Sequence, residues 1–251
     1  MNELALFAGI HGIGLGLKRA FERRGLPFRT VCYVEWDDYC VEVLRARMRD
    51  GLLDDAPIWG DITTFDGRPW AGCVDIVTGG FPCQDLSFAG RGAGLEGERS
   101  GLFYEMWRIV REVRPKIVLM ENSTGLLGRG MDRVAAEVAS SFYDIQGDCI
   151  SAHAFGSPQV RERLFFIAYR DAINGEAGVG CKPNGQKPIF TNGDPKCSEI
   201  WVEAADKAAR MDDGIPGELY RQRVEVLGNA VVPQVAEYVG ERLIEWLDSG
   251  G

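Results

Sequence analysis

The sequence lacks any run of eighteen apolar residues, about the shortest length that indicates a membrane-spanning helix. Met1-Asn2-Glu3 leads directly into a strand pattern, so no signal peptide is expected either. C-x-x-C pairs are also absent: the seven cysteines are scattered, which argues against zinc sites and disulfide frameworks. These absences predict a soluble cytoplasmic protein that holds no metal.

Histidine and positive charge are scarce as well. Of the two histidines, His11 and His153, only His153 is placed to serve a cysteine–histidine hydrolase, which is the less favoured interpretation. The net charge of −9 argues against binding nucleic acids through a generally basic surface. Arginines nevertheless gather between Arg91 and Arg163, so a local basic face stays open.

Short β-branched runs alternate with stretches of helical periodicity along the chain. We expect strands near 4–7, 29–34, 58–63, 73–77, 116–120, 143–150 and 163–169, and helices near 15–21, 39–49, 103–113, 131–140, 200–210 and up to 247. This alternation predicts a doubly wound α/β fold, in which ligands bind at the carboxyl ends of the strands. From Asp171 to about Ser198 glycine, asparagine, proline and lysine dominate, which indicates a loop-rich insert.

The first two predicted strands carry a nucleotide-binding pattern. A strand, the glycine loop 8–14 and a helix open the chain, and Glu35 closes the second strand about twenty residues after the loop. Its carboxylate is placed to accept the ribose hydroxyls of an adenosine, and Trp36 offers a face for the adenine. Asp61, after the third strand, could accept from the adenine amino group. The alternatives are a solvated carboxylate for Glu35 and a core aromatic for Trp36.

A thiol and a carboxylate follow two later strands. Cys83 comes just after Gly79-Gly80 and Pro82, and Glu121 ends the next buried strand, so both are expected to face one pocket. This pair suits chemistry in which a thiolate joins an electron-poor ring carbon while an acid protonates a ring nitrogen. The alternative for Cys83 is an inert, buried hydrophobic side chain.

Several motifs occur in an order that resembles the DNA (cytosine-5)-methyltransferase family, with the closest likeness to its compact bacterial and phage members. These motifs are Phe7-Ala8-Gly9, Glu35-Trp36-Asp37, Gly60-Asp61-Ile62-Thr63, Gly80-Phe81-Pro82-Cys83-Gln84, Glu121-Asn122, Gln159-Val160-Arg161-Glu162-Arg163 and Gly228-Asn229-Ala230-Val231. The resemblance covers nearly the whole chain. It implies a doubly wound, Rossmann-like, S-adenosylmethionine-dependent methyltransferase fold with a very small target-recognition lobe.

The resemblance also implies roles for single residues. Cys83 would attack carbon 6 of a flipped-out cytosine, Glu121 would protonate its nitrogen 3, and Arg163 would hold the base carbonyl oxygen. Arg161 would help to place Glu121 or a phosphate. The S-adenosylmethionine site would comprise Phe7, Gly9, Gly12, Glu35, Trp36, Asp61, Ile62, Pro82, Asn229 and Val231. Substrate contacts would come from Gln84, Ser87, Arg99, Asn122 and Gln159.

The chain departs from the family pattern at two single positions and in one region. His11 stands where the family has the second glycine of its loop, which puts close approach to the cofactor in doubt, and Ser123 stands where valine is common. We expect residues 1–170 to form the catalytic and cofactor-binding domain, 171–221 a minimal target-recognition region, and 222–251 a C-terminal segment that returns to the catalytic domain. So small a recognition region implies a short or relaxed recognition sequence.

The implied partner is double-stranded DNA, read by a monomer at the nucleoid, with a cognate restriction endonuclease as a further candidate partner. Two other functions stay open. One is an RNA (tRNA) cytosine-5 methyltransferase of the same fold, and the other is a catalytically silent binding protein, which His11 and the small lobe would suit. Comparing methyl transfer to duplex DNA and to tRNA separates them.

Overall fold

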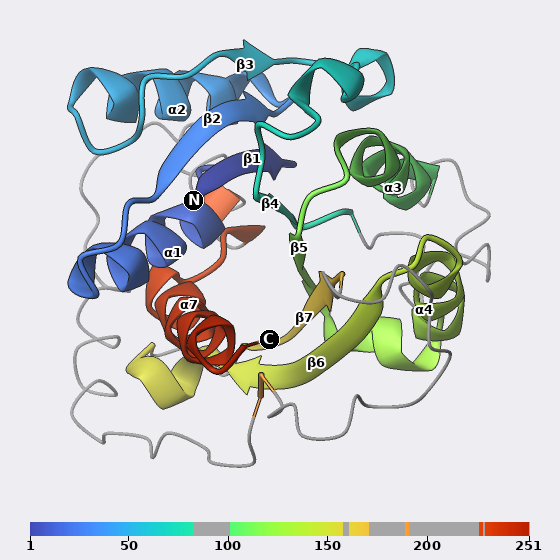
Figure 1. Cartoon of the computed structure of the whole chain (residues 1–251). Coiled ribbons are helices and arrows are strands. Elements are labelled where there is room, and N and C mark those ends of the chain that lie inside the picture. The colour runs from blue at the N-terminus through green and yellow to red at the C-terminus, as the bar shows by residue number, and fades with distance from the viewer. Residues whose placement is uncertain (83–100, 158–160, 171–188, 191–225, 228, 251) are drawn as a thin grey trace.

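The computed structural model describes residues 1–82, 101–157, 161–170, 189–190, 226–227 and 229–250. These residues form a seven-stranded sheet with helices on both faces (Figure 1). The strands are β1 (Asn2–Leu6), β2 (Arg29–Val34), β3 (Ile58–Trp59), β4 (Ile76–Gly79), β5 (Ile117–Ser123), β6 (Asp144–Ser151) and β7 (Glu162–Tyr169). The α-helices are α1 (Gly12–Arg23), α2 (Asp38–Arg49), α3 (Gly101–Val113), α4 (Met131–Ser140) and α7 (Pro233–Asp248).

The strand order is β3-β2-β1-β4-β5-β7-β6. The first five strands in this order pair in parallel, whereas β7 runs antiparallel to both of its neighbours, β5 and β6. The order reverses at β1, so the carboxyl ends of β1, β2, β4 and β5 meet at one edge, where the α/β rule places ligands. The predicted doubly wound α/β fold is confirmed.

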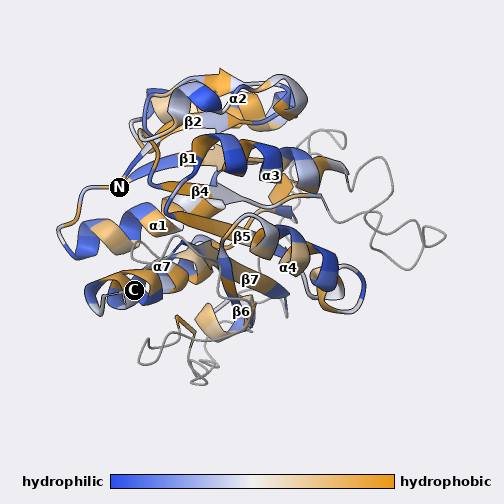
Figure 2. Ribbon diagram, turned by 45° about the vertical axis from the view of Figure 1, so that its right-hand side comes forward, coloured by the Kyte–Doolittle hydropathy of each residue, from blue (hydrophilic) through white to orange (hydrophobic). Residues whose placement is uncertain are grey.

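Each face of the sheet carries its own apolar core. Helices α1 and α7 pack on Ile117, Leu119 and Phe165, which alternate along their strands with residues of the other face. Helix α2 covers β2 on the same side. Helices α3 and α4 pack on the opposite face, over Val118 and Met120. Figure 2 shows the resulting pattern, with hydrophobic strands in the middle and hydrophilic residues on the outer sides of the helices.

The first and last helices approach each other unusually closely, and glycine makes this contact feasible. A Cβ on Gly16 of α1 would lie 2.4 Å from the carbonyl oxygen of Pro233 and 2.7 Å from the backbone nitrogen of Glu237. In the same way, a Cβ on Gly240 of α7 would lie 2.8 Å from the Cβ of Ala20. The C-terminal helix is therefore held directly against the helix that follows the first strand, as Figure 1 also shows.

Gly16→Ala should destabilise the fold. Alanine in a helix interior ordinarily gains about 1 kcal/mol over glycine, but here the backbone of α7 would have to move, and overpacking typically costs about 1–3 kcal/mol. We expect a net loss in the free energy of unfolding, measured by urea denaturation. Gly101→Ala is the matched control, because no atom lies within 4 Å of a Cβ placed there. A Gly16→Ala protein as stable as the parent would show that α7 adjusts freely.

Some predicted boundaries need correction. The third strand is only Ile58–Trp59, because Asp61 caps a 3-10 helix (Ile62–Thr64) where the strand was expected to continue. The fourth strand begins at Ile76, and Cys73 lies exposed in the preceding turn. Helix α1 begins at Gly12, so the glycine loop is shorter than predicted. The predicted helix at 200–210 and the recognition region 171–221 lie outside the described residues, apart from Ile189 and Phe190. No helix in the described part of the chain is long and apolar enough to cross a membrane.

Candidate active site

Glu121 lies near the end of β5, beside the segment that leads from β4 to Cys83. Strands β4 and β5 pair in parallel, with Gly79 opposite Met120. A Cβ on Gly80 would lie 3.0 Å from Oε2 of Glu121, so the lack of a side chain at Gly80 lets the carboxylate lie against this segment. The predicted convergence of the two strand ends is confirmed up to Pro82, the last described residue before Cys83.

The carboxylate of Glu121 is buried and faces two arginines, Arg163 on β7 and Arg161 just before that strand. Nε of Arg163 lies 3.0 Å from Oε1 of Glu121, as an ion-pair contact rather than an aligned hydrogen bond. Burial raises the pKa of Glu121 above its ordinary value, although the charges of Arg163 and Arg161 act in the opposite direction. A raised pKa keeps more of the carboxyl protonated near neutral pH. Glu121 is therefore suited to donate a proton.

Arg161 makes a different set of contacts from the one expected. Its Nη1 donates to the carbonyl oxygen of Ala230 at 2.6 Å, and its Nη2 donates to that of Asn229 at 2.9 Å. The side chain is buried, and it ties the residue just before β7 to the segment that precedes α7. Its effect on Glu121 is electrostatic and lowers the pKa of that carboxyl. Arg161 thus fixes the position of Asn229, a residue predicted to line the cofactor site.

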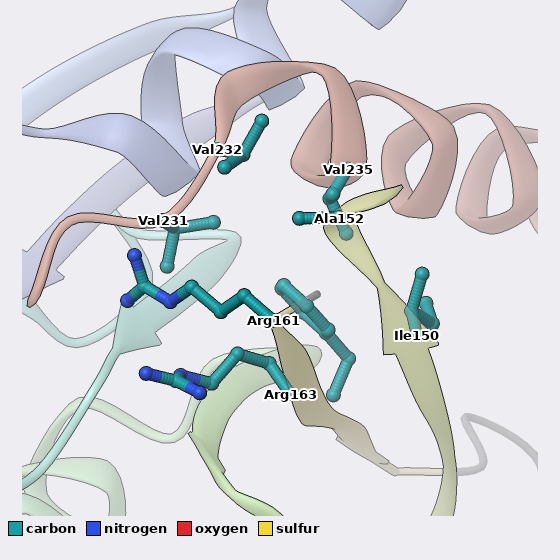
Figure 3. A pocket seen from close by; sticks show the side chains of 8 residues that line it. Ile150, Ala152, Arg161, Arg163, Val231, Val232 and Val235 are labelled. Carbon is teal, nitrogen blue, oxygen red and sulfur yellow. The ribbon is translucent and has the colours of Figure 1, made fainter. Parts of the chain in front are cut away.

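Arg161 and Arg163 extend side by side along one wall of a small open hollow (Figure 3). The wall opposite is apolar and comes from β6 and the residue after it, and from the segment that leads into α7. Its residues are Ile150, Ala152, Val231, Val232 and Val235. The enclosed space has room for about one water molecule, so this hollow is a narrow notch between two cations and an apolar wall.

Asn122 points to the other face of the sheet from Glu121, because side chains alternate along a strand. It is buried, and its Nδ2 donates to the carbonyl oxygen of Phe81 at 3.2 Å. Its Oδ1 accepts from the backbone nitrogen of Ser123 at 2.8 Å. In this structure Asn122 holds the backbone just before Pro82 and Cys83, and its predicted contact with substrate stays a prediction.

The second cluster of predicted residues lies at the ends of β1 and β2. Oε2 of Glu35 accepts from the backbone nitrogen of Gly9 at 2.6 Å, and Oε1 accepts from that of Asp37 at 2.9 Å. Glu35 is buried, which excludes a freely solvated carboxylate, and burial raises its pKa even though these two hydrogen bonds act to lower it. Trp36 is 84% exposed, so it is not a core aromatic. Each carboxylate oxygen keeps a lone pair for a ligand beside the open Trp36 ring.

Asp61 and Ile62 follow the short strand β3. The side chain of Asp61 caps the 3-10 helix by accepting from the backbone nitrogen of Thr63 at 2.9 Å and from its hydroxyl at 2.7 Å. The hydrogen bonds from Thr63 lower the pKa of Asp61, so this carboxylate stays ionised. Ile62 is buried beneath it. An exposed anion above an apolar residue is compatible with the predicted adenine contact, which remains a prediction.

Several residues at and after the end of β1, in the loop that leads to α1, adopt left-handed backbone conformations. Phe7, Gly9 and His11 all have positive φ angles, of 49°, 53° and 67°. A Cβ on Gly12 would lie only 2.2 Å from the carbonyl oxygen of Val231, so these two predicted cofactor residues contact each other. Gly12 is thus required by the close approach of the C-terminal segment.

The sequence reasoning missed a buried polar cluster beneath this loop. Glu3, Thr30 and Thr78 come from three neighbouring strands, and His11 joins them from the loop. The available signal was an acid and two threonines inside otherwise apolar strands. Of the predicted site residues, Cys83, Gln84, Ser87, Arg99 and Gln159 lie outside the described part of the chain. Among the described residues, no group of acids, cysteines and histidines is placed to bind a metal ion.

The comparisons with known proteins agree with this geometry. A family model for C-5 cytosine-specific DNA methylases matches residues 1–207. The type II methyltransferase M.Eco47II of Escherichia coli is 34% identical over 239 residues, covering 92% of this chain and 52% of its own. M.HhaI of Haemophilus parahaemolyticus is 34% identical over 178 residues, covering 69% and 50%. The chain spans about half the length of the curated relatives it matches.

Solved structures show the same fold at low sequence identity. A prophage-encoded protein of Escherichia coli, assigned as a DNA modification methyltransferase, superposes with a TM-score of 0.64 at 17% identity over 99% of both chains. The Dnmt2 methyltransferase of S. pombe superposes with a TM-score of 0.54 at 15% identity, over 99% of this chain and 97% of its own. The methyl donor of the matched family is S-adenosylmethionine. From the family match together with the fold, this chain belongs to the C-5 cytosine-specific DNA methylases.

Proposed function

We propose that this chain transfers a methyl group to carbon 5 of a cytosine flipped out of double-stranded DNA, through a covalent adduct with Cys83. The observation that carries the proposal is Glu121, a buried carboxyl with a raised pKa in contact with Arg163. It lies against Gly80, and Cys83 follows three residues later in the chain. An acid beside a thiol is what addition across the carbon 5–carbon 6 bond of cytosine requires.

In the proposed reaction, Cys83, Glu121 and Arg163 each have a separate role. The Cys83 thiolate forms a bond to carbon 6, while the Glu121 carboxyl gives its proton to nitrogen 3 and so accepts the displaced charge. Arg163 holds the base carbonyl oxygen and keeps Glu121 oriented. S-adenosylmethionine, when bound, supplies the methyl group that carbon 5 accepts. Loss of the carbon 5 proton to a base then expels the Cys83 thiolate, and nitrogen 3 returns its proton to Glu121.

The residues at the ends of β1 and β2 fit the adenosine part of the methyl donor. Glu35 is fixed by two backbone donors and keeps lone pairs for the ribose hydroxyls. Trp36 presents an open ring to an adenine. Nothing lies within 4 Å of a Cβ placed on Gly9, so the loop is open beside the carboxylate. These features support the predicted cofactor residues as a group.

Glu35→Ala should weaken S-adenosylmethionine binding by about 1.5–3 kcal/mol, the scale of a lost hydrogen bond to a charged group. Isothermal titration calorimetry with the purified protein measures this loss. Glu42→Ala, an exposed acid on α2, is the matched control and should bind as the parent does. Equal affinity in Glu35→Ala and the parent would place the adenosine elsewhere.

The substrate is tested by offering the enzyme duplex DNA and tRNA in parallel, with labelled S-adenosylmethionine. We expect 5-methylcytosine in DNA only. Methylation of tRNA alone would favour the RNA enzyme, and cofactor binding without any methylated product would favour the silent binding protein. Both alternatives share the fold, so only the product decides between them.

The recognition sequence should be short. Each good bidentate base contact gives about 1–3 kcal/mol of discrimination, and the stretch from Asp171 to Glu199 offers few suitable side chains, which predicts about two to four specified base pairs. Bisulfite sequencing of DNA from cells that express the protein should show methylation at many sites sharing such a motif. A defined site of six or more base pairs would require readout by other parts of the chain or by a partner.

Several wider features belong to the same proposal. A DNA substrate places the enzyme at the nucleoid in the cytoplasm, and the type II relatives motivate a cognate restriction endonuclease as a partner. We also propose a monomer with domain limits at 1–170, 171–221 and 222–251.

A further inference from the structure

Glu3 is an acid buried completely within the sheet, near the start of β1. Its Oε2 accepts from the hydroxyl of Thr30 on β2 at 2.6 Å, and its Oε1 accepts from that of Thr78 on β4 at 2.7 Å. Burial acts to raise the pKa of Glu3, but the charge of His11 and hydrogen bonds from His11, Thr30 and Thr78 outweigh it and lower the pKa. Glu3 is therefore an ionised carboxylate with a built set of partners.

His11 completes this set from the loop between β1 and α1. Its Nε2 lies 3.4 Å from Oε2 of Glu3 and 3.1 Å from the hydroxyl of Thr30, and its ring meets that of Tyr33 edge-on at 4.8 Å. The imidazole is buried although the residue belongs to a loop, so the side chain points inward, away from any ligand on the outside. From the sequence, His11 puts close backbone approach to the cofactor in doubt. The inward orientation keeps the imidazole off the outer side of the loop, and the approach itself stays a prediction.

Gly14 makes the inward position of the imidazole feasible. A Cβ on Gly14 would lie 2.1 Å from Cε1 and Nε2 of His11, and 2.6 Å from Oε2 of Glu3. His11 also has a left-handed backbone, with φ of 67° and ψ of 37°, which non-glycine residues adopt only when other contacts compensate. The contacts with Glu3, Thr30 and Tyr33 provide that compensation.

The same loop is fixed at two other points. The backbone nitrogen of Gly9 donates to Glu35, and that of Ala8 donates to the carbonyl oxygen of Val34 at 3.1 Å. His11 adds a third fixed point at the other end of the loop, just before α1. Phe7 to His11 are thus held between the buried contact of His11 with Glu3 on one side and the proposed ribose-binding carboxylate on the other.

We propose that Glu3 and His11 are positioning residues, which through their buried contact hold the Phe7–His11 loop in the conformation that receives S-adenosylmethionine. The inference rests on the proposed cofactor site. Without the pair, the loop samples other conformations, and the apparent affinity falls by the fraction of molecules that remain competent. A loop that is competent about one tenth of the time binds about tenfold more weakly. Once the cofactor saturates the enzyme, the rate of methyl transfer is restored.

The test measures three quantities for each variant: the Kd of S-adenosylmethionine by calorimetry, kcat at saturating cofactor, and stability in urea. His11→Gly permits the left-handed backbone but removes the contact with Glu3, and it should raise Kd about tenfold with kcat within about twofold. His11→Gln keeps an amide donor near the position of Nε2 and should recover most of the affinity. Glu3→Gln should weaken binding like His11→Gly, and combining the two should add little, because they remove one shared contact.

Gly14→Ala gives an independent route, because its Cβ would collide with the His11 ring and with Oε2 of Glu3 while both residues stay unsubstituted. It should also raise Kd, whereas Gly128→Ala, where no atom lies within 4 Å of the added Cβ, should not. Unchanged Kd in folded His11→Gly, Glu3→Gln and Gly14→Ala would overturn the inference, even if stability fell. Glu35→Ala, measured alongside, tests the proposed cofactor site separately: weaker binding there with unchanged binding in the other variants rejects this inference alone.

Discussion

Cys83→Ser is expected to abolish methyl transfer while leaving S-adenosylmethionine binding and folding intact. A serine hydroxyl is far less acidic than a thiol, so it forms too little of the anion that must attack carbon 6 of the cytosine. The assay is incorporation of labelled methyl groups into duplex DNA at saturating cofactor. Cys73→Ser is the matched control, because Cys73 is an exposed cysteine outside the site.

A trapping experiment tests the same step from the other side. Release of Cys83 requires loss of a proton from carbon 5 of the target cytosine. A fluorine at that carbon cannot leave as a cation in its place, so the covalent adduct with Cys83 should persist. Mass spectrometry of a protease digest should find the modified peptide in the parent protein and not in Cys83→Ser. Near-normal turnover by Cys83→Ser would exclude the covalent mechanism.

Glu121→Gln should lower kcat by about 10²–10⁴, the usual contribution of a general acid or base. Glutamine keeps the shape of the side chain and a contact for Arg163, but it cannot give nitrogen 3 a proton. Cofactor affinity should change little, because Glu121 lies on the β5 side of the site. Glu22→Gln, an exposed acid on α1, is the matched control and should keep full activity.

The dependence on pH gives Glu121 a second signature. Burial raises the pKa of Glu121, and the acid form is the active donor, so the parent rate should fall as pH rises through that pKa. Because the pKa of Glu121 is raised in the folded protein, its protonated form adds to the free energy of unfolding at low pH. This contribution declines as pH rises through the same pKa. Glu121→Gln should lack the descending limb in its residual rate. A residual rate with the parent profile would assign that limb to another group.

Hydrophobic periodicity predicted those strands and helices whose ends are marked by residues nearby in the sequence. Strand Arg29–Val34 and helix Met131–Ser140 have the expected bounds, because β-branched alternation and helical periodicity both end at clear breaks. Glu35 and Trp36 were expected at the end of β2, and their burial and exposure agree with the proposed roles. The predicted third strand was too long because the cap formed by Asp61 was overlooked.

Contacts between distant segments could not be predicted in this way. The bonds from Arg161 to Asn229 and Ala230 cross more than sixty residues of sequence and depend on where α7 returns. The inward turn of His11 depends on Glu3, on two threonines of neighbouring strands and on the missing side chain of Gly14. Such arrangements depend on the order of the strands in the sheet, which local periodicity in the sequence does not reveal.

The close contact between α1 and α7 has a consequence for protein synthesis. Helix α1 leaves the ribosome early, but the partner that covers it, from Val231 through Pro233 to Gly240, is translated more than two hundred residues later. Until then, the nascent chain exposes the apolar side of α1 and of the strands beneath it. Folding of this face therefore waits for the C-terminal segment, and Asn229 and Val231, two of the proposed cofactor residues, arrive with it.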